Sequence, residues 1–223
     1  MLTRSQKTEE PGTKLKLLDA AVVLMRRKGF AATTVDEICA EAGVTKGGFF
    51  HYFKTKDDIA KAAIERFYES KAVEFQEAPF RKLADPLDRV FGRLDFAKKS
   101  SGGSRQVTKG CLLGMFAQEL SFTNPGLRDT CRSALERIAA DFEKDLAEAK
   151  AIYSPKMEFE PRSVAMLYLS IIQGSQMMAK VAESNAVLAE NIEQFRRYLQ
   201  SIFGVSPSRA RKPGSKAFDS SSN

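Results

Sequence analysis

Apolar side chains recur at intervals of three and four residues along most of this 223-residue chain, which is the period of an α-helix. The pattern therefore predicts an all-α fold of about nine helices. The expected helices span about residues 13–28, 35–42, 46–53, 55–78, 86–100, 110–120, 125–153, 161–184 and 186–203.

Two of these helices begin with a capping signal that fixes where they start. Thr34 and Glu37 match the S/T-x-x-E capping box, in which each side chain satisfies a backbone N–H that lacks a partner at the helix start. Thr55 and Asp58 repeat the arrangement. A helix is thus expected to begin at about residue 35 and another at about residue 56.

The short helices 35–42 and 46–53 are separated by a turn around Gly43, where glycine permits the left-handed backbone that ends a helix. Two short helices joined in this way form a helix-turn-helix, whose second helix enters a DNA groove. Gly47 and Gly48 each lower the helix propensity of that second helix by roughly 1 kcal/mol relative to Ala. Close approach of the backbone to DNA is the usual reason for such a pair.

The segment GFAATTVDEICAEAGVTKGGFFHYFKTKDDI, residues 29–59, resembles over its whole length the N-terminal signature of the TetR family of bacterial transcriptional regulators. Gly48 and Cys39 depart from it, since relatives mostly carry Ser, Thr or Ala at the first position and Ala at the second. The resemblance implies a three-helix DNA-binding domain followed by a helical ligand-binding and dimerisation domain. The boundaries expected are a flexible arm at 1–12, the DNA-binding domain at 13–54, the second domain at 55–204 and a disordered basic tail at 205–223.

By the same resemblance, candidate DNA-binding residues divide into those that donate to phosphates and those that approach base edges. The phosphate donors expected are Thr33, Thr34, Thr45, Tyr52, Lys54 and Lys56. The residues expected near base edges are Lys46, Gly47, Gly48 and His51. Of Phe49, Phe50 and Phe53, at least two are expected in the core.

No catalytic constellation, metal set or phosphate-binding loop stands out in the sequence, so we expect a protein that is not an enzyme and needs no cofactor. Its one histidine and three scattered cysteines cannot form a zinc site. An unrecognised enzymatic activity in the larger domain stays as a remote alternative. The net charge of +7 favours a polyanionic partner.

The composition favours a cytoplasmic location. No apolar run approaches the length of a membrane span, and the polar first ten residues do not resemble a signal peptide. Three cysteines, an odd number without metal-ligand spacing, suit free thiols in a reducing compartment.

The family resemblance also implies that a small inducer binds the second domain, tilts the helix that starts near residue 56 and releases the protein from its operator. Flexible and aromatic side chains in this region form a pool of candidate pocket residues and suggest a largely apolar ligand. The pool comprises Phe91, Phe96, Cys111, Met115, Phe116, Phe122, Cys131, Tyr168, Gln173, Met177 and Met178.

The last two helices are expected to pair two copies into a homodimer that reads a pseudo-palindromic operator. Apolar residues after 188 repeat at spacings of four and three, the narrow stripe used in helix association. The interface expected comprises Leu167, Ile171, Gly174, Leu188, Ile192, Phe195, Leu199 and Ile202.

Cys111 supports a second hypothesis, because it lies near a helix start and two residues after Lys109. Both features lower a thiol pKa. The GCLLG element also resembles a branch of the family that senses electrophiles or oxidants through a cysteine. A small buried apolar residue is the other interpretation of Cys111.

Overall fold

A computed structural model describes residues 11–100, 110–155 and 157–206. The arm expected at 1–12 is therefore described only at Pro11 and Gly12, and the tail expected at 205–223 only at Val205 and Ser206. The Ser-Gly segment after residue 100 lies outside the described residues.

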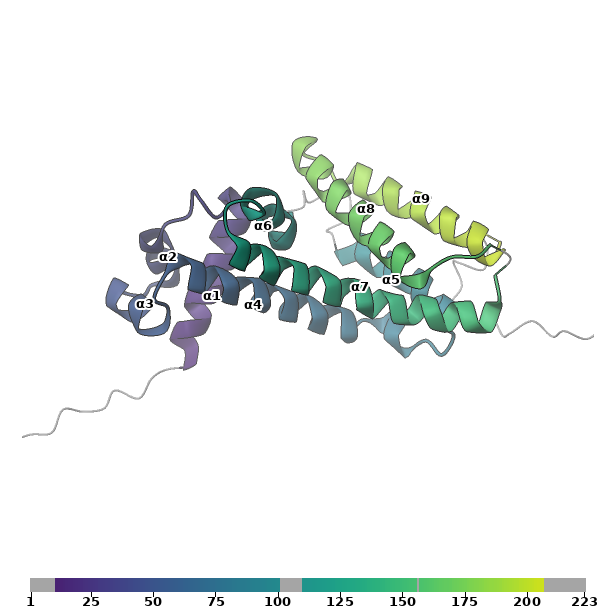
Figure 1. The fold of residues 1–223 in the computed structure, drawn as a ribbon, viewed down its shortest axis with the longest axis horizontal. Helices are drawn as coiled ribbons and strands as arrows, with labels where there is room; N and C mark the ends of the chain where they lie inside the picture. The colour runs from purple at the N-terminus through teal and green to yellow at the C-terminus, as the bar shows by residue number, and fades with distance from the viewer. Residues whose placement is uncertain (1–10, 101–109, 156, 207–223) are drawn as a thin grey trace, which may run out of the picture. The chain divides into compact units, whose positions relative to one another are not determined.

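The described residues form nine α-helices, one short 3-10 helix and no strand, which confirms the all-α prediction (Figure 1). The helices are α1 Pro11–Lys28, α2 Val35–Ala42, α3 Lys46–Tyr52, α4 Lys56–Gln76, α5 Pro86–Ser100, α6 Leu112–Leu120, α7 Pro125–Tyr153, α8 Pro161–Val181 and α9 Ala186–Phe203. The 3-10 helix η1 covers Pro79–Lys82 and was not predicted. The predicted start of α1 at residue 13 was two residues late, because Pro11 fits the first turn of a helix.

The chain packs into two compact units, each described here by itself. Unit 1 comprises residues 1–70 and 111–134, and unit 2 comprises residues 71–110 and 135–223. Unit 1 thus contains α1, α2, α3 and α6 together with the first parts of α4 and α7. The functional boundary expected at residue 55 stays a prediction.

The core of unit 1 joins helices that are distant in sequence. Leu17, Ile38, Phe49, Ile59 and Phe116 are all completely buried and come from five different helices. The three helices of the helix-turn-helix region therefore pack together with α4 and α6.

The turn between α1 and α2, residues 29–32, is held by side chains from two other helices. Gly29 has a φ of +87°, and a Cβ atom there would lie 2.8 Å from Oε2 of Glu119 on α6. The Glu119 carboxylate accepts hydrogen bonds from the backbone N–H of Phe30 at 2.8 Å and of Ala31 at 2.6 Å. The Lys56 ammonium donates to the carbonyl of Phe30 at 3.1 Å and lies 4.1 Å from the centre of its ring. We call these residues, with Glu119 and Lys56, the Phe30 turn.

The predicted helix starts at α4 and α7 are confirmed by side-chain hydrogen bonds. The Thr55 and Asp58 side chains accept each other's backbone N–H at 3.1 and 3.0 Å. Asn124 caps α7 by accepting the N–H of Leu127 at 3.1 Å, and its amide donates to Asp57 at 2.6 Å.

Unit 2 is built around α5, α8, α9 and the second part of α7. Figure 1 shows α8 and α9 lying antiparallel as a hairpin. Phe142 from α7, Tyr168 from α8 and Phe195 from α9 meet in the buried core, with ring centres 4.9 and 5.4 Å apart. Gly92 lets α5 approach η1, because a Cβ atom there would lie 2.5 Å from Cβ of Phe80.

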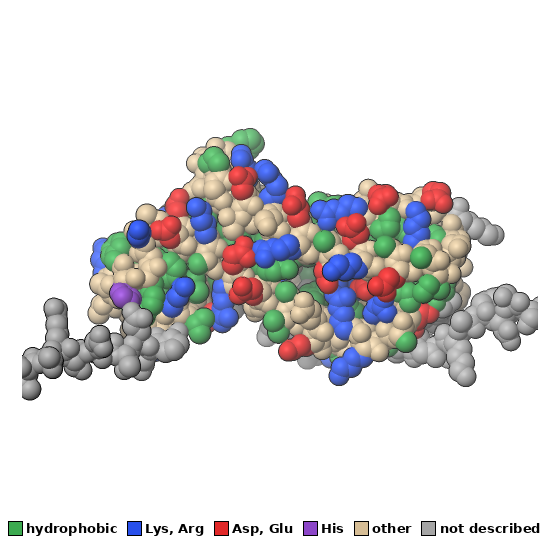
Figure 2. All heavy atoms as spheres, turned by 60° about the horizontal axis from the view of Figure 1, so that its bottom comes forward, with side chains coloured by type: hydrophobic (Ala, Val, Ile, Leu, Met, Phe, Trp, Pro, Cys, Tyr) green, Lys and Arg blue, Asp and Glu red, His purple; other side chains and the backbone are tan. Residues whose placement is uncertain are grey.

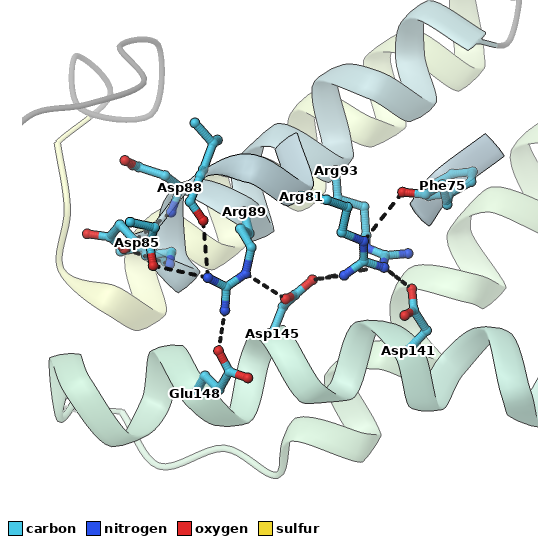
Figure 3. A network of polar contacts seen from close by, with 12 residues as sticks. Phe75, Arg81, Asp85, Asp88, Arg89, Arg93, Asp141, Asp145 and Glu148 are labelled. Carbon is cyan, nitrogen blue, oxygen red and sulfur yellow. Dashed lines mark hydrogen bonds and ion pairs between the residues drawn. The ribbon is translucent and has the colours of Figure 1, made fainter. Parts of the chain in front are cut away.

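A network of arginines and carboxylates crosses unit 2 between α5, η1 and α7 (Figure 3). Asp145 accepts from Arg81 and from Arg89, each at 3.0 Å, and its side chain is only 5% exposed. Asp141 binds both Arg81 and Arg93. The three positive charges therefore share acidic partners supplied by one face of α7.

Arg93 is the most buried member of this network, with a side chain 3% exposed. Its guanidinium lies 5.2 Å from the ring centre of Phe75, 5.5 Å from Phe80 and 5.0 Å from Phe142. Burial raises the pKa of Asp141, but the charges and hydrogen bonds of Arg93 and Arg81 outweigh it and hold that pKa below its usual value. The ionised form of Asp141 is thus the one that stabilises the fold.

We predict that Asp141→Asn lowers the free energy of unfolding by about 1–3 kcal/mol at neutral pH. This is below the ~3–5 kcal/mol typical of a fully buried pair, because the Asp141 side chain is 38% exposed. A depressed folded pKa gives stability that is present above the unfolded pKa of ~3.9 and is lost as pH falls through the folded value. The difference between wild type and variant should therefore shrink in acid, as measured by urea unfolding at pH 7 and near pH 3.

Glu148→Gln is the matched control, because the Glu148 side chain binds Arg89 but is 59% exposed. This substitution should lower the free energy of unfolding by less than ~1 kcal/mol. Equal effects of the two variants at every pH would contradict the role given to Asp141.

Candidate nucleic-acid interface

The first helix of the candidate interface, α2, starts and ends as the sequence predicts. Thr34 accepts the N–H of Glu37 at 3.2 Å, and Glu37 accepts the N–H of Thr34 at 2.9 Å, which completes the capping box. A hydrogen bond from Lys28, followed by those from Thr34, lowers the pKa of Glu37 to about 2. Gly43 ends the helix with a φ of 63°. The capping box thereby fixes the start of α2, and Gly43 marks its end at the turn before α3.

The second helix, α3, has a buried side that anchors it and an exposed side that is free to meet a partner. Thr45 caps it by accepting the N–H of Gly48 at 3.1 Å. Phe49 is completely buried and Phe53 is 5% exposed, whereas Phe50 is 50% exposed. The expectation that at least two of the three phenylalanines are core residues is confirmed. Sequence reasoning did not include Phe50 among the candidate contacts, although its spacing from the buried Phe49 and Phe53 was visible.

The two glycines of α3 have different surroundings. A Cβ atom at Gly48 would lie 2.8 Å from Cγ1 of Val44, so the protein itself requires a small residue there. A Cβ atom at Gly47 would meet only the Thr45 hydroxyl, at 3.9 Å. Packing against Val44 therefore accounts for Gly48 and corrects the reason given from sequence, whereas close approach to DNA stays a prediction for Gly47. Val44 itself, which follows the Gly43 turn, is partly buried.

Lys46 opens α3 and forms an ion pair of 2.8 Å with Asp36 in the first turn of α2. Both side chains are well exposed, at 61% and 71%. The hydrogen bond from Lys46 to Asp36 raises the pKa of the lysine, which keeps it positively charged. A DNA contact by Lys46 must therefore share or replace this partner.

His51 and Lys54 are both exposed, one on α3 and one just after it. Figure 2 shows the imidazole of His51 in purple at the surface. Its ring centre lies 4.8 Å from that of Tyr52, in an edge-on arrangement. Both rings belong to the last turn of α3, the helix that the buried Phe49 anchors.

Three of the phosphate donors expected from sequence have other roles in the structure. Thr33 is completely buried, and its hydroxyl donates to the carbonyl of Gly29 at 2.6 Å, so its side chain is removed from the candidate set. Lys56 is partly buried and uses one N–H in the Phe30 turn. Thr34 is exposed but already caps α2.

The stripe expected to pair two copies is instead used inside unit 2. Leu188, Ile192, Phe195, Leu199 and Ile202 are at most 2% exposed and belong to the core that α9 forms with α5, α7 and α8. Their assignment to a dimer interface was wrong, because a stripe of this spacing packs equally well within one chain.

The outward side of α8 carries the other three residues expected in that interface. Leu167 is 42% exposed, Ile171 is partly buried, and a Cβ atom at Gly174 would meet nothing within 4 Å. Met178, 51% exposed, continues the spacing of four, three and four. We call these four residues the α8 face. Met166, Met177 and Val181 add further exposed apolar area on the same helix.

The candidate pocket residues do not form one cluster within a single unit. Those of unit 1 are Cys111, Met115, Phe116, Phe122 and Cys131, and those of unit 2 are Phe91, Phe96, Tyr168, Gln173, Met177 and Met178. Phe122 is 98% exposed in the turn after α6, so its assignment to a pocket is corrected.

Several of the other pool members are core residues. Phe91 and Tyr168 lie in the core of unit 2, where burial raises the pKa of Tyr168 to about 12. Phe116 is completely buried in unit 1.

The three cysteines are reduced and differ in exposure. Cys39 is buried, and burial raises the pKa of buried Cys131 to about 12, so neither thiol is suited to react. Cys111 is partly exposed and occupies the N-cap position of α6. Burial lowers the pKa of Arg26, and the nearby Cys111 opposes that change through its charge. Lys109 lies outside the described residues.

Within the described residues, no three His, Cys, Asp or Glu side chains are placed to hold a metal ion. None of the described helices is long and apolar enough to cross a membrane.

Comparison with known proteins identifies both parts of the chain. Residues 17–63 match the family model described as bacterial regulatory proteins, tetR family, and residues 86–195 match the one described as a tetracyclin repressor-like C-terminal domain. The transcriptional regulator AcuR from Cereibacter sphaeroides is 29% identical over 74% of this chain and 75% of its own. The transcriptional repressor NemR from Escherichia coli is 23% identical over 80% of this chain and 89% of its own.

Solved structures show the same fold. The regulatory protein TetR from Rhodobacter sphaeroides superposes with a TM-score of 0.71 at 25% identity, covering 86% of this chain and 97% of its own. The reduced form of Escherichia coli NemR superposes with a TM-score of 0.72 at 22% identity, covering 85% and 97%. Together with the anchored helix-turn-helix, these matches show that the chain belongs to the TetR family and is a DNA-binding transcriptional regulator.

Proposed function

We propose that this protein is a transcriptional repressor that binds a pseudo-palindromic operator as a homodimer and leaves it when a small, largely apolar molecule binds. The observation that carries the proposal is α3, whose one side is anchored by Phe49 while Lys46, Gly47 and His51 are exposed. NemR and the similar DhaR from Mycobacterium are both named as repressors, which supports the sign of regulation.

The exposed residues have chemistry that suits distinct parts of a DNA groove. The Thr45 hydroxyl accepts the Gly48 N–H, which leaves its own O–H to donate to a phosphate. Lys54 and Tyr52 are also candidates for phosphate contact. Lys46, Gly47 and His51 are candidates for base edges, because they lie on the first turns of the helix that enters the groove.

This assignment is tested by selecting an operator from a random DNA pool and then comparing two lysine variants. Lys54→Ala should weaken binding to all DNA sequences alike. It should also reduce the slope of log affinity against log salt concentration by about 1. Lys46→Ala should instead reduce the discrimination between the operator and its single-base variants, by roughly 10-fold at one position. Binding is measured by fluorescence anisotropy over a range of salt concentrations.

Lys144→Ala removes the same charge from an exposed position on α7 in unit 2 and serves as the control. An effect of this variant as large as that of Lys54→Ala would indicate a general charge effect. Failure of the wild-type protein to enrich any DNA sequence would overturn the proposed function.

The α8 face is our candidate for the contact between two copies. A glycine inside an exposed helix costs roughly 1 kcal/mol relative to alanine, and a small residue allows a second helix to approach closely. Gly174 lies at the centre of the α8 face, between Leu167, Ile171 and Met178. Two subunits joined in this way would present recognition helices to half-sites about 34 Å, or a multiple, apart.

We predict that Leu167→Glu converts the dimer into monomers, because the contact would bury an unpaired charge. Sedimentation equilibrium should show the lower mass, and operator affinity should fall at least about 10-fold, since one half-site alone is bound. Ile152→Glu is the control, because Ile152 is a 65% exposed apolar residue of the same unit outside the α8 face. Dimers that persist in Leu167→Glu would exclude this face.

The inducer proposal requires only that the ligand prefer the conformation that does not bind DNA. A preference of a few kcal/mol is sufficient to empty most operators. The pool of pocket residues, without Phe122, stays a prediction of an apolar ligand.

A cysteine sensor is the second candidate, and the position of Cys111 favours it. Cys111 is partly exposed, occupies the N-cap position of α6 and lies near Arg26, which is the kind of position in which reactive cysteines are found. The NemR structure that superposes on this chain is of the reduced form of that protein.

One experiment separates the two candidates. Release from the operator is measured with a library of apolar compounds and with N-ethylmaleimide, for wild type and for Cys111→Ser. Release by an apolar compound that is equal in both proteins supports the ligand-responsive repressor. Release by N-ethylmaleimide that disappears in Cys111→Ser supports the sensor instead. If neither treatment releases the wild type, control by release is wrong.

A further inference from the structure

Phe50 is the feature of the candidate interface that the proposed function leaves unexplained. It is 50% exposed, although the other two phenylalanines of this segment are buried. It follows Lys46 by four residues and Gly47 by three, so all three lie on the same side of α3. The exposed side of the helix therefore presents a large apolar ring beside a positive charge.

The ring of Phe50 is held in a defined orientation. Its centre lies 5.2 Å from that of Phe49, with the two planes at 81° in an edge-on arrangement. Because Phe49 is completely buried, it provides a fixed support for the exposed ring. Gly47 adds no side chain on the same side of the helix, which leaves space for another molecule to reach the ring.

The chemistry of a phenyl ring restricts what it can contact in the major groove. It has no polar atom, so it can neither donate to a phosphate nor pair with the donors and acceptors of base edges. The apolar group that the major groove offers is the 5-methyl group of thymine. A phenyl ring on the exposed side of a recognition helix is therefore matched to this group.

We propose that Phe50 is a specificity-determining residue that contacts the 5-methyl group of one thymine in each half-site of the operator. The proposal rests on the proposed function, because it requires α3 to enter the major groove. It assigns to α3 an apolar contact in addition to the polar contacts of Lys46 and His51.

The test uses duplexes of the selected operator in which each thymine is replaced in turn by uracil, which removes only the methyl group. Wild-type affinity should fall about three- to tenfold at one symmetry-related pair of positions, the amount expected for losing one buried methyl contact. Phe50→Ala should bind duplexes that carry thymine or uracil at that pair of positions with equal affinity. Phe50→Leu, which keeps an apolar side chain, should retain part of the difference.

Val23→Ala is the matched control, because Val23 is also a 50% exposed apolar residue of unit 1 but lies on α1. This variant should keep the full difference in affinity between the thymine and uracil duplexes. Circular dichroism of each variant confirms that its helical content is unchanged.

The outcomes separate this inference from the proposed function. If the wild type binds an operator but no thymine is sensitive to uracil, or if Phe50→Ala and Phe50→Leu keep the full sensitivity, the role of Phe50 is overturned while DNA binding stands. If no DNA sequence is bound by the wild type, both proposals fail.

Discussion

The peptide group of Phe30 is the point on which the DNA-binding part of this protein depends. Glu119 of α6 accepts its N–H and that of Ala31, and Lys56 of α4 donates to its carbonyl, so two helices supply the hydrogen-bond partners of one turn. The buried hydroxyl of Thr33 donates to the Gly29 carbonyl and continues this network to the capping box of α2. The polar groups named here all have partners, which fixes the start of α2 and, through the Gly43 turn, the position of α3.

Unit 2 is held by a different balance of forces. Its apolar core includes the stripe of α9, and the arginine network between α5, η1 and α7 places charges beside that core (Figure 3). Arg93 combines carboxylate partners with three aromatic rings, which together offset part of the cost of burying its guanidinium. The α8 face contains no such compensated charge and is exposed and apolar, which suits an intermolecular contact.

Sequence reasoning was most successful where a local signal decides the structure. The capping boxes at Thr34 and Thr55 and the glycine at position 43 act within a few residues, and they gave correct helix boundaries. It failed where the partner of a side chain is distant in the chain. The apolar stripe from Leu188 to Ile202 has the same spacing whether it packs on its own chain or on another. The exposure of the Phe122 side chain depends on the turn that follows α6. Sequence alone could not show that Glu119 binds residues nearly ninety positions away.

The composition of unit 1 has a consequence for how this protein can be divided. The helix-turn-helix lies within residues 35–52, yet the carboxylate that satisfies the turn before it belongs to a segment that begins after residue 110. A fragment cut after α3 would leave the N–H groups of Phe30 and Ala31 without their acceptor and the ring of Phe30 without its edge-on contact to Phe116. The DNA-reading part is thus not a transferable cassette of consecutive residues, and chimaeras between relatives should exchange residues 11–70 and 111–134 together.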